Sequence, residues 1–159
     1  MGSGYTPPSV SAQSVPSAPD PVEAAAQANR MIAEGQAGTM LPALRMEYLE
    51  VGPARMVARI PVAANTQPYG LLHGGATAAL CETLGSFGTA VAAGTDKIVT
   101  GIELNVNHLK SVREGHLTGV ATPVHVGRTT AVWEMRAHDD EGRLVAVGRL
   151  TLLIREPSS

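Results

Sequence analysis

A short glycine-bearing segment and the apolar stretch behind it hold the residues best suited to chemistry. His73, Gly74 and Gly75 stand directly before a long run of small and apolar residues. Within that run, over 74–95, the only side chain that is charged at neutral pH is Glu82. If the run is a helix, its first turn offers unbonded backbone N–H groups and the positive end of the helix dipole. Such a start suits a polarised carbonyl or a developing oxyanion.

Glu82 and Ser86 would share one face of this helix, because they lie four residues apart. A carboxyl group that is screened from water without a cation has a raised pKa. Together with the helix start, the two side chains suggest acyl transfer or hydrolysis. Structural interpretations stay open beside this one: Glu82 paired with a distant Arg, His73 capping the loop, and Ser86 bonding a helix carbonyl.

Length and composition exclude several classes of protein. The 159 residues, 44% hydrophobic and 16% charged, suit one domain with a core of its own. A single Cys excludes an intramolecular disulfide framework and a Cys-rich zinc site. Twelve Lys and Arg against fourteen Asp and Glu, with 3% aromatic residues, argue against a nucleic-acid surface. We expect no secretory signal and, given five Gly and Glu82 over 74–95, no membrane span, so we predict a cytoplasmic protein.

The N-terminal region divides into a tail and a helix. Residues 1–20 are mostly Ser, Pro, Gly and Ala, a composition typical of disordered chain. Asp20 as N-cap, Pro21 in the first turn and Gly35 as the stop predict a short helix over 21–36. The remaining residues, 37–156, are expected to form one domain.

The pattern around the long helix predicts an antiparallel sheet. Two strand-like runs, over 40–51 and 54–62, precede the helix. Behind it, alternation at Ile102, Leu104 and Val106 begins a series of strands, which continues over 116–126, 129–138 and 143–154. Consecutive strands with tight turns imply antiparallel pairing, so the single helix must lie across one face of the sheet. The fold class is therefore α+β.

The string from Gln67 to Glu82 resembles the signature of the hotdog-fold acyl-CoA thioesterases, especially the phenylacetic-acid-pathway type. That signature has Asn or Gln six residues before His-Gly-Gly and an acidic residue nine after the His. Gln67, His73 and Glu82 meet these spacings. The combination of Gln and Glu is most similar to the 4-hydroxybenzoyl-CoA thioesterase branch that uses Glu. The resemblance extends beyond this string and covers about residues 40–155.

The resemblance implies a fold, an activity and an assembly. The fold would be a long central helix wrapped by a curved antiparallel sheet of about six strands, with a short N-terminal helix added. The activity would be hydrolysis of an acyl-CoA, with an aryl, arylacetyl or medium-chain acyl group, to the free acid and CoA. Family members are homodimers with continuous sheets and active sites at the subunit interface. They often pair again, so we expect a homotetramer.

The resemblance also implies roles for individual residues. The Gly74 N–H would polarise the thioester carbonyl, and Glu82 of the facing subunit would attack it or activate a water. Gln67 and His73 would orient the acyl group, the water or the carboxylate. Ser86 stands where a related enzyme has a hydroxyl residue.

Coenzyme A requires groups that bind its phosphates and its pantetheine arm. Family members place these on the strands after the helix and on a Gly-containing turn that corresponds to Gly127. The resemblance therefore implies that Arg128 and Thr129 bind CoA, followed by Lys110 and Arg113. A surface turn kept soluble by Lys110 and Arg113 is an equally open interpretation.

No metal or separate cofactor is expected, because CoA is itself part of the substrate. Four of the five His lie scattered over different predicted strands, without the spacing of a metal site. Neither a P-loop nor a dinucleotide fingerprint is found.

Two other functions remain as alternatives. The first is a non-catalytic acyl-CoA-binding protein, a sensor or scaffold, since one fold serves many functions. The acid at Glu82 argues against it, because a pure binder gains nothing from a buried acid that faces a thioester. The second is hydration of an enoyl-CoA. That branch pairs Asp with a His a few residues later, whereas here no His follows Glu82 before His108.

Overall fold

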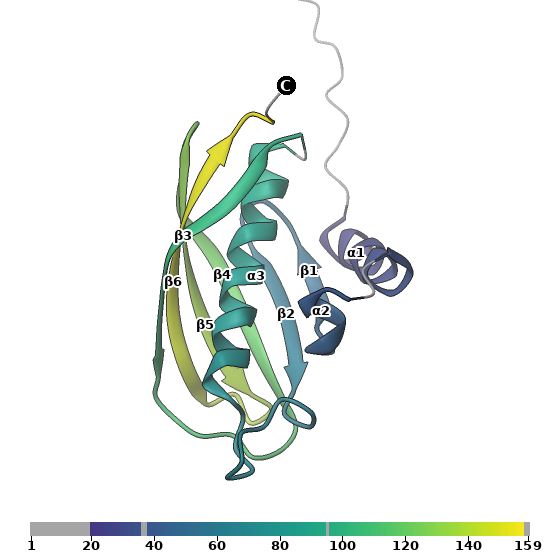
Figure 1. Cartoon of the computed structure of the whole chain (residues 1–159), viewed down its shortest axis with the longest axis vertical. Coiled ribbons are helices and arrows are strands. Elements are labelled where there is room, and N and C mark those ends of the chain that lie inside the picture. Colours follow the sequence, from purple (N-terminus) through teal and green to yellow (C-terminus); the bar gives the residue numbers. More distant parts are fainter. Residues whose placement is uncertain (1–19, 36–37, 95, 158–159) are drawn as a thin grey trace, which may run out of the picture.

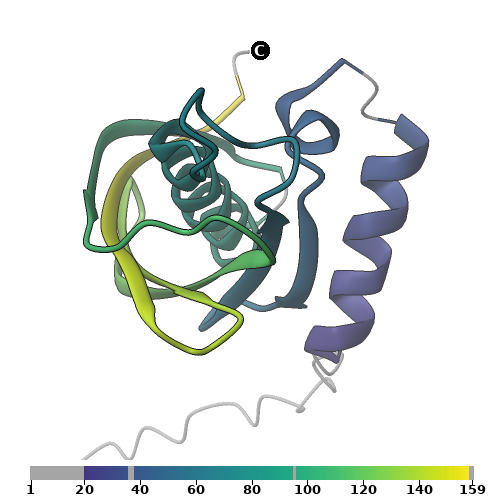
Figure 2. The ribbon, with the colours of Figure 1, turned by 90° about the horizontal axis from the view of Figure 1, so that it is seen from below.

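One long helix runs across a six-stranded antiparallel sheet that curls around it (Figures 1 and 2). The computed structural model describes residues 20–35, 38–94 and 96–157. The central helix is α3 (Gly74–Ala93), and the strand order is β1-β2-β4-β5-β6-β3. The strands are β1 (Glu47–Val51), β2 (Met56–Pro61), β3 (Ile98–His108), β4 (His116–Val126), β5 (Thr130–Asp139) and β6 (Leu144–Arg155). The predicted α+β architecture is confirmed.

Glycines let the helix approach the sheet closely. A Cβ on Gly88 would lie 2.6 Å from Cη2 of Trp133, and a Cβ on Gly85 would lie 2.6 Å from a methyl of Leu150. Trp133 and Leu150 are 1% exposed and fill the space between helix and sheet. Two of the glycines that make this helix unsuitable for a membrane, Gly85 and Gly88, are thus packing positions. No helix in the described residues is both long and apolar enough to span a bilayer.

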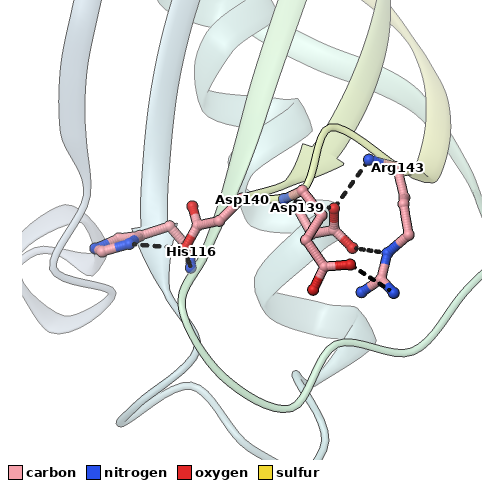
Figure 3. Close-up of polar contacts among 5 residues, drawn as sticks. His116, Asp139, Asp140 and Arg143 are labelled. Atoms are coloured by element: carbon pink, nitrogen blue, oxygen red, sulfur yellow. Dashed lines mark hydrogen bonds and ion pairs between the residues drawn. The ribbon is translucent and has the colours of Figure 1, made fainter.

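The strands behind the helix lie where their alternation predicts. The strand expected over 116–126 is β4, and the runs over 129–138 and 143–154 are β5 and β6 shifted by one residue. The β5–β6 turn is held by Asp139, whose carboxylate accepts the Arg143 Nε–H at 2.7 Å and its backbone N–H at 2.9 Å (Figure 3). Burial alone would raise the pKa of Asp139, but these bonds and the nearby guanidinium hold it below its ordinary value.

The strand predicted over 40–51 is wrong in its first half. Residues Met40–Ala43 form a short helix, α2, and only Glu47–Val51 form β1. Pro42 has no N–H for a strand ladder but is tolerated in the first turn of a helix. Leu44 then donates to the Met40 carbonyl at 3.0 Å, and Arg45, at φ 52°, turns the chain into β1.

Strand β3 is an edge strand with an irregular face. It pairs with β6 on one side and ends the sheet on the other. A register shift between Gly101 and Glu103 puts Ile102 outside the alternation, and this side chain is 59% exposed. Val106 packs against the core as the alternation predicts. Most of β3 is exposed within one chain.

The N-terminal helix, α1 (Pro21–Gly35), covers the opposite edge of the sheet (Figure 2). It begins as predicted, since the Asp20 carboxylate accepts the Val22 N–H at 2.9 Å. The Asn29 side chain donates to the Tyr48 carbonyl at 2.8 Å and accepts the Tyr48 N–H at 2.9 Å. It therefore satisfies the backbone of β1 much as another strand would. The tail predicted over 1–20 lies outside the described residues except for Asp20.

Candidate active site

The loop before α3 is shaped so that the helix start faces a cavity. Asn65 is 8% exposed, and its side-chain Nδ2 donates to the backbone carbonyls of Leu44 and Pro61. The backbone carbonyl of Asn65 accepts the His73 N–H at 2.8 Å. His73 is the N-cap of α3, and its Nδ1 accepts the Gly75 N–H at 2.8 Å. The structure thus gives His73 the capping role that the sequence left open.

The Gly74 N–H is left available by this arrangement. No acceptor among the described residues bonds it, whereas the Gly75 and Ala76 N–H groups are occupied by the His73 side chain and carbonyl. The imidazole of His108, at the end of β3, lies against Gly74: a Cβ there would be 2.9 Å from Nε2. Any side chain at position 74 would therefore crowd His108 and the free N–H.

Gln67 lies in the same cavity as the helix start. Its backbone N–H donates to the Leu71 carbonyl at 2.8 Å, and Gly70 closes the turn at φ 71°. The cavity has a volume of about 400 Å³. Its walls include Gln67, Leu72, Gly74, Thr77, His108 and Lys110.

Glu82 lies halfway along α3 and is half-buried. Ser86 is its hydrogen-bond partner, with Oγ 3.5 Å from Oε1, and no cation among the described side chains forms an ion pair with it. The carboxylate lies directly against the backbone of Gly101 in β3, where a Cβ would be 3.0 Å from Cδ. Burial raises the pKa of Glu82, and the Ser86 hydroxyl partly offsets this.

A second cavity, of about 430 Å³, adjoins the carboxylate. Glu82, Thr83 and Ser86 of α3 supply its polar wall together with Lys97, whose ammonium group pairs with Asp96 and Glu156. The rest is apolar and includes Met31 and Ile32 of α1, Tyr48 of β1 and Phe87 of α3 itself. This cavity does not contain Gln67 or Gly74, which line the first one.

The predicted catalytic residues therefore fall into two groups within one chain. Gly74 and Glu82 are eight residues apart on α3, which corresponds to about 12 Å along the axis. An N–H donor and an attacking group that act on one carbonyl must both lie about 3 Å from it. One chain cannot meet that condition with these two residues.

The four predicted CoA-binding residues also separate. Lys110 lines the cavity with Gln67, and Arg113 follows in the same loop, with Nη1 3.4 Å from the Tyr69 carbonyl. Arg128 and Thr129 are exposed at the other end of the sheet, where the Thr129 carbonyl accepts the Ile154 N–H at 2.8 Å.

Two residues at the site had no predicted role there. Gly101 leaves room for the Glu82 carboxylate, and His108 lies over Gly74. Both belong to β3, which passes along α3 in the fold. Their contacts join residues that lie far apart in the sequence, so spacing along the chain does not show them. Within the described ranges, no three His, Cys, Asp or Glu gather in a metal-binding cluster.

The chain is similar to known thioesterases in sequence and in fold. Residues 69–146 match the thioesterase superfamily. The 1,4-dihydroxy-2-naphthoyl-CoA hydrolase of Escherichia coli K12 is 39% identical over 118 residues, which are 74% of this chain and 87% of that protein. The proofreading thioesterase EntH of Cronobacter turicensis is also 39% identical over 118 residues, covering 74% of this chain and 86% of EntH. The solved structure of the Haemophilus influenzae thioesterase HI1161 covers 83% of this chain and 90% of its own, with a TM-score of 0.76 and 34% identity.

The chain belongs to the thioesterase superfamily and has its hotdog fold. The resemblance based on Gln67, His73 and Glu82 is thereby confirmed at the level of the family. As a member with thioesterases among its relatives, the protein is a thioester hydrolase.

Proposed function

We propose that the protein hydrolyses acyl-CoA thioesters as a homodimer, in which Glu82 of one subunit acts on a carbonyl bound at Gly74 of the other. The observation that carries this is the separation of the two groups. Gly74 with Gln67 and Glu82 with Ser86 line different cavities of one chain, about 12 Å apart along α3. A second copy brings one group of each kind together.

The free edge of β3 is the natural contact for that second copy. It offers unpaired backbone groups along 11 residues, together with the exposed side chains of Ile102 and Leu104. Pairing two such edges about a twofold axis gives antiparallel strands and buries the same surface on both subunits.

The contacts of β3 with α3 also fix the register of this pairing. Gly101 lies against Glu82, and His108 lies against Gly74. Glu82 meets the partner's helix start only if Gly101 comes close to His108 of the partner subunit. A twofold axis at Asn105 achieves this. It places Glu103 opposite Asn107 of the partner subunit, and because Ile102 is the extra residue of a bulge, Gly101 then comes opposite His108 of the partner subunit.

The same axis collects the groups suited to CoA. Because the strands run antiparallel, the end of the sheet that carries Arg128 and Thr129 meets the end that carries Lys110 of the partner subunit. Lys97 and Arg155 line a cavity of about 290 Å³ beside Arg128, in which Lys97 is also paired with Asp96 and Glu156. Guanidinium and ammonium groups at such a place suit the phosphates of CoA.

The chemistry then follows from the groups in place. The Gly74 N–H and the dipole of α3 stabilise the oxyanion that forms on the thioester carbonyl. Glu82 takes a proton from water, which adds to the carbonyl carbon, and the proton passes to the departing thiolate of CoA. In the other route Glu82 itself attacks the carbonyl and water then cleaves the anhydride. Both routes give the free acid and CoA and need an ionised Glu82.

The relatives support these roles. Two solved structures of the Staphylococcus aureus protein SAV0944, 35% identical with TM-scores of 0.70 and 0.71, carry an alanine at position 32 in place of Gln and at position 47 in place of Glu. Those positions are 15 apart (47 − 32), as are Gln67 and Glu82 (82 − 67). The E. coli relative acts on an aromatic acyl-CoA by its name, so an aromatic acyl group is our first choice of substrate.

The test is thiol release from 4-hydroxybenzoyl-, phenylacetyl-, hexanoyl- and palmitoyl-CoA. We expect at least one aromatic thioester to turn over, and Glu82→Gln to lose at least about a hundredfold of that turnover while remaining folded and dimeric. Glu134→Gln, an exposed position on β5, is the matched control and should keep its activity. Binding of acyl-CoA without any release would instead identify a non-catalytic binder.

A further inference from the structure

The second cavity has a wall that comes from outside the helix and strands that carry the catalytic groups. Ala28, Met31 and Ile32 of α1 line it opposite Glu82 and Ser86. Met31 is 58% exposed although it lines the cavity, so it lies at the rim. Ile32 is partly buried and packs against the core, so it lies deeper. The helix that covers the β1 edge thus also closes the space beside the catalytic carboxylate.

Hydrogen bonds to Tyr48 hold α1 in position, and Tyr48 itself forms the next part of the wall of the second cavity. Asn29 bonds both backbone groups of Tyr48, at 2.8 and 2.9 Å, and the Tyr48 side chain lines the cavity. Tyr48 is only 4% exposed, and no described residue bonds its hydroxyl. Its ring is 5.2 Å from that of Phe87, tilted by 54°. Two aromatic walls at such an angle suit contact with a third ring.

We propose that α1 and Tyr48 form the outer wall of the acyl subsite, where Ile32 and Met31 limit its size and the Tyr48 hydroxyl binds a polar substituent on an aromatic acyl group. This rests on the proposed function, because it places the acyl group beside Glu82. The Tyr48 hydroxyl is not fully enclosed, because Trp133 Nε1 is the only enclosed side-chain polar atom without a partner in the described residues. A substituent that bonds this hydroxyl replaces the water that otherwise would, whereas an unsubstituted ring that displaces the water leaves the hydroxyl without a partner. Apart from Lys97, the remainder of the wall is apolar and favours a ring over water.

The size limit is tested with Ile32→Ala and Met31→Ala, separately and combined. We measure kcat/KM for benzoyl-CoA and for the two-ring naphthoyl-CoA. Removing these side chains should raise the ratio of kcat/KM for naphthoyl-CoA to that for benzoyl-CoA by about fivefold or more, because a few methylene groups in a pocket typically change substrate selectivity by such a factor. Val22→Ala removes an exposed apolar side chain of the same helix, outside the cavity, and should leave the ratio unchanged. An unchanged ratio in the Ile32 and Met31 variants would overturn the role of α1.

The substituent is tested with Tyr48→Phe, which keeps the ring and removes only the hydroxyl. We expect kcat/KM for 4-hydroxybenzoyl-CoA to fall by about tenfold relative to benzoyl-CoA. Equal effects on the two thioesters would overturn the hydroxyl as the group that reads the substituent.

Failure of this inference is distinct from failure of the proposed function. If the native chain releases thiol from none of these thioesters, the proposed function fails. The acyl subsite is then judged by the dissociation constants of the same CoA thioesters for the native chain and these variants. If the native chain is active and the ratios do not move, only the assignment of α1 and Tyr48 fails.

Discussion

The Glu82 carboxyl group combines partial burial with a single weak hydrogen bond. Burial raises its pKa and the Ser86 hydroxyl lowers it. Since either route needs the ionised form, kcat/KM should fall with decreasing pH through a pKa above that of an ordinary Glu. Ser86→Ala removes the hydrogen bond that lowers the pKa of Glu82, so the acid limb of the kcat/KM profile should move to higher pH. A pH profile of kcat/KM measures this.

Thr83→Ala is the control for the pH profile. It removes a hydroxyl from the same helix that forms no bond with Glu82. Its acid limb should stay in place. A limb that moves to lower pH in Ser86→Ala would contradict the assigned bond.

Gly101 determines where the carboxylate can lie. A methyl group there would occupy the space of the carboxylate, and the backbone at this position tolerates Ala because its φ is not positive. Gly101→Ala should therefore fold with little change in Tm but lose about tenfold or more in kcat, because small displacements of reacting groups are costly. Thr100→Ala, at the exposed neighbouring position, should keep its kcat. Equal activity of both variants would exclude this positioning role.

At the scale of elements, α1 contributes stability through one side chain. Asn29→Ala would leave the N–H and carbonyl of Tyr48 without their partners at the edge of the sheet. We expect a loss of about 1–3 kcal/mol in the free energy of unfolding, measured by urea denaturation. Gln27→Ala, at an exposed position of the same helix, should change little. A loss no larger than that of the control would mean that α1 is not held by this pair.

The elements were predictable where a local pattern determined them. Periodicity and turn residues predicted α3 and the three strands from β4 to β6, and Asp20 predicted the start of α1. The same reasoning missed α2, because the apolar residues around Pro42 resemble a strand. The spacing of Gln67, Gly74 and Glu82 identified the candidate site. It could not reveal Gly101, His108 or Asn29, since their contacts depend on residues distant in the sequence.

At the scale of the whole molecule, the proposed mechanism requires a dimer with a defined register along β3. An axis at Asn105 places this residue opposite itself, with Cα atoms about 4.5–5.5 Å apart, within the range of a disulfide. Asn105→Cys should therefore form a covalent dimer under oxidising conditions, seen on a non-reducing denaturing gel. The native Cys81 is 2% exposed, and burial raises its pKa to about 12, so it contributes no background.

Neighbouring positions on β3 provide the controls for the register. Asn107→Cys alone should remain monomeric on the gel, because it faces Glu103 of the partner subunit. The double variant with Glu103→Cys and Asn107→Cys should cross-link. A covalent dimer from Asn107→Cys alone would place the axis elsewhere on β3.

The sharing of each active site between two subunits is tested most directly by mixing two variants that are each expected to lose activity. Glu82→Gln lacks the carboxylate and Gln67→Ala lacks a group on the other side of the site. In a dimer of one subunit of each kind, one site carries both changes and the other carries neither. We expect the purified mixed dimer to recover about half of the native kcat, because one of its two sites is intact. Activity no higher than the mean of the two parent variants would contradict a shared site and place Gln67 and Glu82 in the same chain's catalysis.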